Sequence, residues 1–90
     1  MYKIKKPSKA QIEVLKKLNE GIFLMRNDFI SITYYIYNSH TKERERINSN
    51  VGRSLSYSIF VTFDKTKEQD RTIRYYFISE LGKQALNGEA

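Results

Sequence analysis

The chain has 90 residues, of which 40% are hydrophobic, 13% aromatic and 29% charged. This composition is typical of one small globular domain and excludes a disordered tail. Without cysteine, disulfides and thiolate metal sites are excluded as well. The charged N-terminus and the lack of an 18-residue apolar run predict neither a signal peptide nor a membrane span. We therefore expect a cytoplasmic protein without a membrane partner.

The formal net charge of +6 is concentrated at the N-terminus. Residues 1–17 hold six lysines and one glutamate, a net charge of +5, whereas residues 18–90 hold ten basic and nine acidic side chains, a net charge of +1. A basic arm of this kind suits contact with nucleic-acid phosphates, and a solvated N-terminus is the alternative. We divide the chain into a basic arm, residues 1–7, and a single domain, residues 8–90.

Residues 7–21 predict the first helix. Ser8 and Gln11 have the spacing of a capping box, in which each side chain binds the backbone N–H of the other residue. Gly21 is suited to end the helix. Three- and four-residue spacing then places one apolar stripe on the helix, made of Ile12, Val14, Leu15 and Leu18.

Residues 22–37 have the composition of β-strands. Asn27 and Asp28 form a turn signal after a short apolar run. From residue 29 to residue 37, β-branched and aromatic residues alternate, which predicts a strand hairpin or a strand that follows a bend. One face of this segment would carry Ile30, Ile32, Tyr34 and Ile36, and the other would carry Phe29, Ser31, Thr33, Tyr35 and Tyr37.

A second helix is predicted at residues 49–58, after a polar loop. Val51 and Leu55 are four residues apart and are expected to face the core, although Gly52 weakens the helix. Residues 59–63 and 72–78 then predict two strands of a hairpin with a charged tip. Ile59, Val61 and Phe63 share one face of the first strand. Ile73, Tyr75 and Phe77 share one face of the second strand and are expected to face the core.

The chain is predicted to close with a short helix at about residues 80–87. Ser79 would cap this helix. Its apolar residues Leu81, Ala85 and Leu86 are expected to seal the core.

Three segments of the chain resemble the winged-helix superfamily, in particular small bacterial and phage proteins related to PadR- and MarR-like regulators. The segments are "AQIEVLKKLNEG" in the first helix, "NVGRSLSYSIFVTF" leading into the first wing strand, and "RYYFISELGKQAL" at the close. The resemblance implies an α+β fold in the order helix, strands, helix, β-hairpin wing and short C-terminal helix. Two features depart from it: Ile59 replaces the usual glycine, and residues 22–37 predict strands where the family has its second helix.

The resemblance implies a non-enzymatic DNA-binding protein, such as a dimeric transcriptional regulator of a phage or mobile element. Its partner would be double-stranded DNA. The expected phosphate contacts are Lys3, Lys5 and Lys6 in the arm, Lys9 at the start of the first helix, and Lys65, Lys67 and Arg71 in the wing. The expected contacts from helix 49–58 are Asn48, Ser49, Asn50, Arg53 and Tyr57, because asparagine and arginine pair with base edges.

Simpler roles remain open for the same residues. Asn48 and its neighbours are also residue types that cap helices. Asp64, Glu68 and Asp70 interleave with the basic residues of the wing, so this tip can equally be solvated. The alternating charges of residues 42–46 resemble a solvated surface more than a binding stripe.

The chain has seven tyrosines, a high number for its length. Tyr34, Tyr35, Tyr37, Tyr75 and Tyr76 can stack on single-stranded nucleic acid, or they can fill the core and form a homodimer contact. We favour core and dimer contact, because no aromatic signature of RNA-binding domains accompanies them.

A protein-interaction module is the second functional hypothesis. The body beyond the arm is nearly neutral, and winged-helix folds also serve as interaction scaffolds, as in a phage accessory or anti-host factor that binds a host or phage protein. An enzyme is not expected: His40 is the only histidine, and no nucleophile, phosphate-loop or metal-ligand spacing occurs. No cofactor or metal is expected either.

Overall fold

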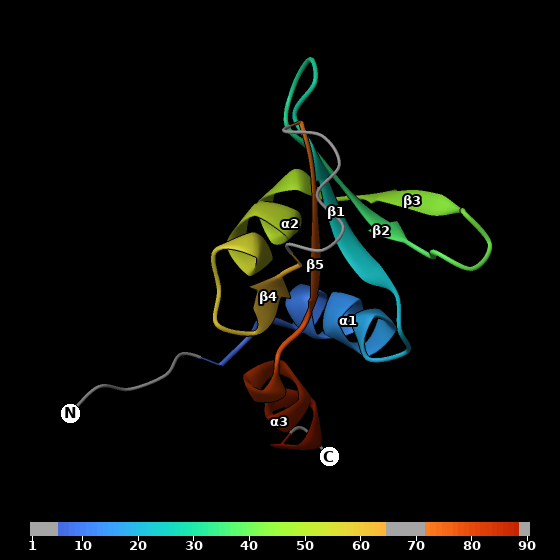
Figure 1. Ribbon diagram of the computed structural model, residues 1–90. Helices are drawn as coiled ribbons and strands as arrows, with labels where there is room; N and C mark the ends of the chain where they lie inside the picture. The colour runs from blue at the N-terminus through green and yellow to red at the C-terminus, as the bar shows by residue number, and fades with distance from the viewer. Residues whose placement is uncertain (1–5, 65–71, 89–90) are drawn as a thin grey trace.

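The computed structural model describes residues 6–64 and 72–88. Its five strands form one antiparallel sheet in the order β3-β2-β1-β5-β4, accompanied by three helices (Figure 1). The predicted α+β class is therefore confirmed. The elements are α1 (Lys9–Leu18), β1 (Phe23–Asn27), β2 (Thr33–Tyr37), β3 (Arg44–Ile47), α2 (Ser49–Ser56), β4 (Val61–Phe63), β5 (Ile73–Ile78) and α3 (Glu80–Gly88).

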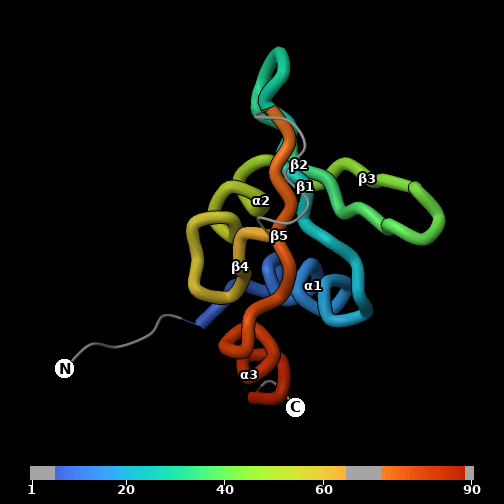
Figure 2. The backbone as a smooth tube through the Cα atoms, in the orientation of Figure 1, coloured from blue at the N-terminus to red at the C-terminus, as the bar shows by residue number. Residues whose placement is uncertain are grey.

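The central strand of the sheet, β1, joins the two halves of the sequence. It pairs with β2, which follows it directly, and with β5, which lies near the end of the chain. The turn between β1 and β2 projects beyond the rest of the molecule, at the top of Figure 2. The β2–β3 hairpin extends to the side of the molecule. In the strand order of the sheet, β3 and β4 are the two edge strands.

The first helix forms within the predicted segment, but it ends at Leu18 with Asn19 as its C-cap, earlier than the predicted end at Gly21. The backbone N–H of Ser8 donates to Gln11 Oε1 at 2.8 Å, and the N–H of Gln11 donates to Ser8 Oγ at 3.2 Å, which completes the capping box. Gly21 has φ of +91°, a conformation that glycine adopts without strain. The predicted apolar stripe, Ile12, Val14, Leu15 and Leu18, is buried.

The hydrophobic core lies between the helices and one face of the sheet, which we call the covered face. Leu24 in β1 is in register with Ile36 on one side and Tyr76 on the other. These strand residues cluster with Leu15 of α1 and Leu55 of α2, both fully buried. The core thus ties together residues from both ends of the chain.

The expected orientation of β5 is wrong. Tyr76 and Ile78 face the core, whereas Ile73 and Tyr75 lie on the opposite face and Phe77 is 41% exposed. The sequence "IRYYFI" is apolar on both faces, so alternation alone does not select the buried one. The register with β1 selects it, because Leu24 and Tyr76 share a face.

The first hairpin starts its return strand later than predicted. Tyr34 and Ile36 are buried, but Ile30, which the sequence places on the same face, is 90% exposed, and Ile32 lies outside β2 as well. The reason is turn chemistry: Asn27 Oδ1 accepts the N–H of Phe29 at 3.0 Å, which bends the chain directly after β1. Residues 28–32 therefore form a loop.

The segment around Ser79 attaches the last helix to the body. Ser79 Oγ donates to the carbonyl of Ile59 at 2.6 Å and accepts the N–H of Gly82 at 3.1 Å, so the predicted cap is confirmed. A Cβ on Gly82 would collide with the carbonyl oxygen of Phe60, which explains the glycine. Leu86 packs against the core, but Leu81 is 40% exposed and does not seal it.

Three further boundaries differ from the prediction. Residues 44–47, expected in a loop, form β3 against β2. The second helix ends at Ser56, and β4 begins only at Val61, which leaves Ile59 exposed. Within residues 6–64 and 72–88, no helix has the length and apolar character needed to cross a membrane.

Candidate nucleic-acid interface

The inner side of α2 fits closely against the covered face. Gly52 lies on the Tyr34 side chain, where a Cβ would collide with the ring, and Leu55 is fully buried. The Tyr34 hydroxyl shares a 3.3 Å hydrogen bond with Ser56 Oγ. These contacts fix the rotation of α2 about its axis, so its outer side is defined as well.

The outer side of α2 presents polar residues to solvent. Asn50 and Arg53 are exposed, and Tyr57, at the C-cap, is 76% exposed. Spacings of three and four residues place these three side chains on one side of the helix. Arg53 forms no ion pair with the described residues. This side therefore offers a cation, an amide and an aromatic ring to a ligand.

Asn48 acts mainly as a helix cap. Its Oδ1 accepts the N–H groups of Asn50 at 2.8 Å and Val51 at 3.3 Å, as asparagine commonly does at this position. Of the two roles considered for Asn48, helix capping and base contact, its Oδ1 atom therefore has the capping role. Ser49, in the first turn, is exposed.

The first turn of α1 lies beside α2. Gln11 Nε2 donates to Ser54 Oγ at 2.7 Å, a bond that joins the two helices. Lys6 and Lys9, which precede Gln11 in the sequence, are exposed. The other expected phosphate contacts, Lys3, Lys5, Lys65, Lys67 and Arg71, lie outside the described residues.

The sheet has a second surface, which we call the open face, on the side away from the core. Strand registers place five aromatic side chains there. None of them belongs to the core cluster that the described helices form with the sheet. They are Phe23, Tyr35, Tyr37, Tyr75 and Phe77. The sequence raised stacking by these tyrosines but did not separate this surface from the core, because it assigned Tyr75 and Phe77 to the core.

Three rings of the open face, those of Phe23, Tyr37 and Tyr75, contact one another through Tyr75. The Tyr75 ring centre lies 5.6 Å from that of Tyr37 and 6.5 Å from that of Phe23, the latter edge to face. Burial in this cluster raises the pKa of the Tyr75 hydroxyl above its ordinary value of 10.0, and proximity to Tyr37 adds to the rise while Arg44 opposes it.

The loop between β1 and β2 forms an exposed apolar tip. Phe29 is 75% exposed, next to Ile30 and Ile32. Large apolar side chains gathered at a projecting tip are unusual on a free surface and mark contact sites. The sequence pattern did not distinguish this tip from a strand.

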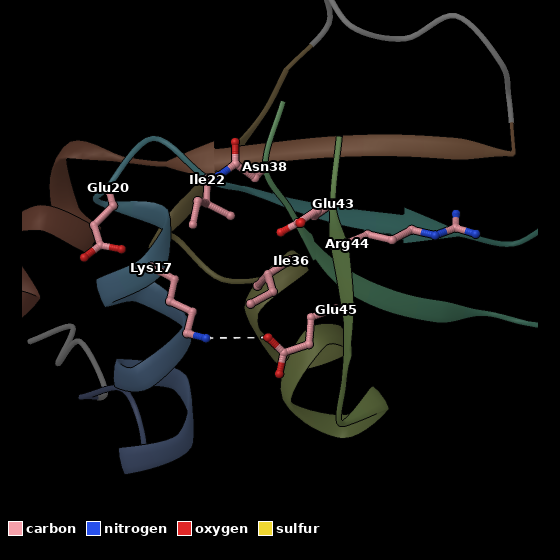
Figure 3. Close-up of a pocket in the computed structure, with 8 residues that line it drawn as sticks. All are labelled: Lys17, Glu20, Ile22, Ile36, Asn38, Glu43, Arg44 and Glu45. Atoms are coloured by element: carbon pink, nitrogen blue, oxygen red, sulfur yellow. Dashed lines mark ion pairs between the residues drawn. The ribbon is translucent and has the colours of Figure 1, made fainter. Parts of the chain in front are cut away.

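A pocket of about 260 Å³ lies between the end of α1 and the β2–β3 hairpin (Figure 3). Its lining includes several charged residues, two of which, Lys17 and Glu45, form an ion pair with Nζ and Oε2 3.7 Å apart. Ile22 and Ile36 form its apolar part. It is smaller and more polar than typical small-molecule sites.

Candidates for catalysis or metal binding are sparse in the part of the chain that the structure describes. No group of three histidine, cysteine, aspartate or glutamate residues is arranged there to hold a metal ion. His40 is exposed in the β2–β3 turn, where its backbone N–H donates to Asn38 Oδ1 at 2.9 Å.

Comparison with protein-family models, curated proteins and solved structures gives no match to this chain. Its function therefore has to be inferred from its own geometry.

Proposed function

We propose that the protein is a non-enzymatic DNA-binding protein that presents the outer side of α2 to the major groove of a duplex. The observation that carries this proposal is the exposed set Asn50, Arg53 and Tyr57 on a helix whose opposite side is fixed against the core. Arginine and asparagine are the side chains best suited to bidentate contacts with guanine and adenine.

The sheet order supports a winged-helix arrangement for this binding mode. The helix α2 is followed by β4 and β5, and these strands continue the sheet from β1 in the order β1-β5-β4. In a winged helix, the corresponding helix enters the groove and the following hairpin flanks it. Strands β1 and β2 lie within residues 22–37, the segment that corresponds to the second helix of that family. We therefore expect α2 to dock on the duplex at an angle different from that of the family.

Duplex binding with an Arg53→Ala variant tests the proposal. The probe is a duplex selected from a random-sequence pool, and affinity is measured between about 50 and 200 mM salt, where phosphate contacts weaken strongly. Arg53→Ala should lower affinity for the selected site by about ten- to hundredfold, as expected for one base contact.

Lys83→Ala is the matched control, since it removes one exposed positive charge from α3. It should bind almost as tightly as the unmodified protein. Absence of duplex binding at low salt, or equal losses in both variants, would contradict the proposal.

A protein-interaction module is the second candidate, and the apolar tip formed by Phe29, Ile30 and Ile32 favours it. A hydrophobic tip of this kind fits a pocket on another protein. A partner captured from a lysate of the source organism should then resist nuclease and about 0.5 M salt, conditions that remove phosphate-driven binding. It should be lost in Phe29→Ser/Ile30→Ser and retained in Arg53→Ala.

A further inference from the structure

The charges of β3 are sorted onto the two faces of the sheet. Because successive strand residues point to opposite sides, Glu45 lies on the side of α1, and Arg44 and Arg46 lie on the open face. Glu43, which directly precedes β3, lines the same pocket as Glu45 and Lys17. Figure 3 shows the Arg44 side chain extending away from Glu43 and Glu45, and Glu45 pairs with Lys17. An alternating sequence of nearly neutral charge thus gives the open face a positive edge.

The positive edge adjoins the aromatic rings. Arg46 is in register with Tyr35, and the guanidinium of Arg44 lies 5.0 Å from the centre of the Tyr35 ring. Arg44 and Arg46 form no ion pair with described residues. Their charge is therefore available to a ligand that lies across the rings.

The aromatic residues of the open face come from three neighbouring strands. Phe23 and Met25 in β1 lie between Tyr37 and Tyr35 of β2 on one side and Tyr75 of β5 on the other. Met25 is only 3% exposed, so the surrounding rings shield it and form the outer surface themselves. A platform of contacting rings on a rigid sheet offers stacking faces at a fixed spacing.

We propose that the open face binds single-stranded nucleic acid. Unpaired bases stack on Tyr35, Tyr37 and Phe23, and phosphates lie along Arg44 and Arg46. Aromatic stacking combined with arginine contacts is the general chemistry of single-strand binding, and it needs no base-specific hydrogen bonds. This site lies on the side of the sheet opposite the core and is independent of the duplex site on α2.

Charge favours a nucleic acid over a second copy of this chain as the occupant. The residues of the five strands that lie on the open face include no aspartate or glutamate; Asp64 follows β4 at the far edge. Pairing two copies through this face would remove the arginines from water without carboxylate partners from the strands, which is costly. A phosphate backbone provides those partners.

Fluorescence anisotropy with labelled single strands of about 12 nucleotides tests the proposal, since sites of this kind span about 4–16 nucleotides. Oligothymidylate and oligouridylate serve as separate probes for DNA and RNA. Both should bind at low salt, and a preference for either shows which sugar the face accommodates. Absence of binding to both would overturn the proposal.

Two sets of variants separate stacking from charge. Tyr35→Ala and Tyr37→Ala should each weaken binding by about five- to hundredfold, whereas Tyr35→Phe and Tyr37→Phe keep the ring and should retain it. Arg44→Gln/Arg46→Gln, both at exposed positions, should weaken the salt dependence of binding. The negative slope of log affinity against log salt should shrink in magnitude by about 1.4, or 0.7 for each phosphate.

Lys16→Gln/Lys83→Gln, at exposed positions on α1 and α3, removes the same number of positive charges away from the open face and should leave the slope unchanged. Equal slopes for the unmodified protein and Arg44→Gln/Arg46→Gln would overturn the proposal. So would concentration-dependent dimerisation that disappears in Tyr35→Ala and Tyr37→Ala, because a second copy would then occupy the face. Duplex binding is tested with a different ligand and with Arg53→Ala, so either site can fail alone.

Discussion

At the scale of single residues, two glycines mark where elements touch. Gly52 admits the Tyr34 ring against α2, and Gly82 admits the Phe60 carbonyl against α3. From the sequence, Gly52 only weakens a helix, because glycine has low helix propensity. The structure gives it a positive role, since any side chain at this position would separate the helix from the sheet.

Gly52→Ala is therefore expected to destabilise the protein by about 1–3 kcal/mol, because overpacking outweighs the gain in helix propensity. Gly88→Ala is the matched control, since a Cβ there meets no atom within 4 Å. It should be neutral or stabilise by up to about 1 kcal/mol. Urea unfolding measures both. Equal stability of Gly52→Ala and the unmodified protein would mean that α2 does not contact Tyr34 this closely.

Tyr75 predicts a pH dependence of stability. Its pKa is raised in the folded state, chiefly by burial, so the folded protein holds this proton more tightly than the unfolded chain. The protonated Tyr75 hydroxyl therefore contributes its full stabilisation of the folded state below about pH 10, and this stabilisation is lost as the pH rises through the raised pKa. Tyr75→Phe should therefore lose less stability than the unmodified protein when urea unfolding is repeated above pH 10.

Tyr57→Phe, altered at an exposed tyrosine, is the control for this measurement. It should follow the unmodified protein at every pH. If Tyr75→Phe also follows it, the Tyr75 hydroxyl is not buried in the ring cluster.

At the scale of elements, the β1–β2 hairpin divides into a buried part and an exposed tip. Ile36 belongs to the core cluster, whereas Ile30 lies in the loop bent by Asn27. Both isoleucines fit one strand face in the sequence, six residues apart. Burial therefore depends on where pairing starts, at Thr33, and not on alternation.

The same substitution at these two positions tests this division. Ile36→Ala should lower the free energy of unfolding by about 2–5 kcal/mol, because it leaves a cavity in the core. Ile30→Ala should change it by less than about 0.5 kcal/mol. Similar losses at both positions in urea unfolding would show that the strand extends through residue 30.

At the scale of the whole molecule, the two proposed sites lie on different surfaces. The outer side of α2 belongs to the helical layer, and the open face lies across the sheet from the core. The body is nearly neutral in total, so any binding of phosphates depends on where charge is placed. Most of the excess charge lies in the first 17 residues.

The arm should accordingly set much of the salt dependence of duplex binding. Replacing Lys3, Lys5 and Lys6 with alanine is expected to weaken the salt dependence. The negative slope of log affinity against log salt should shrink in magnitude by about 2–3, since each neutralised duplex phosphate contributes about 0.9. Binding titrations over a salt series measure this slope.

A variant with Lys16, Lys42 and Lys83 changed to alanine carries the same loss of charge elsewhere. Its slope should stay close to that of the unmodified protein. If both triple variants shift the slope alike, the arm acts only through net charge and makes no phosphate contacts of its own.

The sequence by itself determined the local features of this protein. The capping box of Ser8 and Gln11 and the cap at Ser79 are confirmed, and Gly21 has the positive φ that favours glycine, although the helix already ends at Leu18 with Asn19 as its C-cap. Each depends on residues three or four positions apart, or on one backbone angle, so the pattern is legible without the rest of the fold. The exposed candidates on α2 were predictable for the same reason.

Only the tertiary structure decided which faces are buried and which are available. Tyr75 and Tyr76 are adjacent and identical, yet one lies on the open face and the other in the core, because β5 pairs with β1 in one register. The same rule sends Arg44 and Glu45 to opposite sides once β3 pairs with β2. A strand that is apolar or charged on both faces contains no signal for this choice, which its distant partner makes.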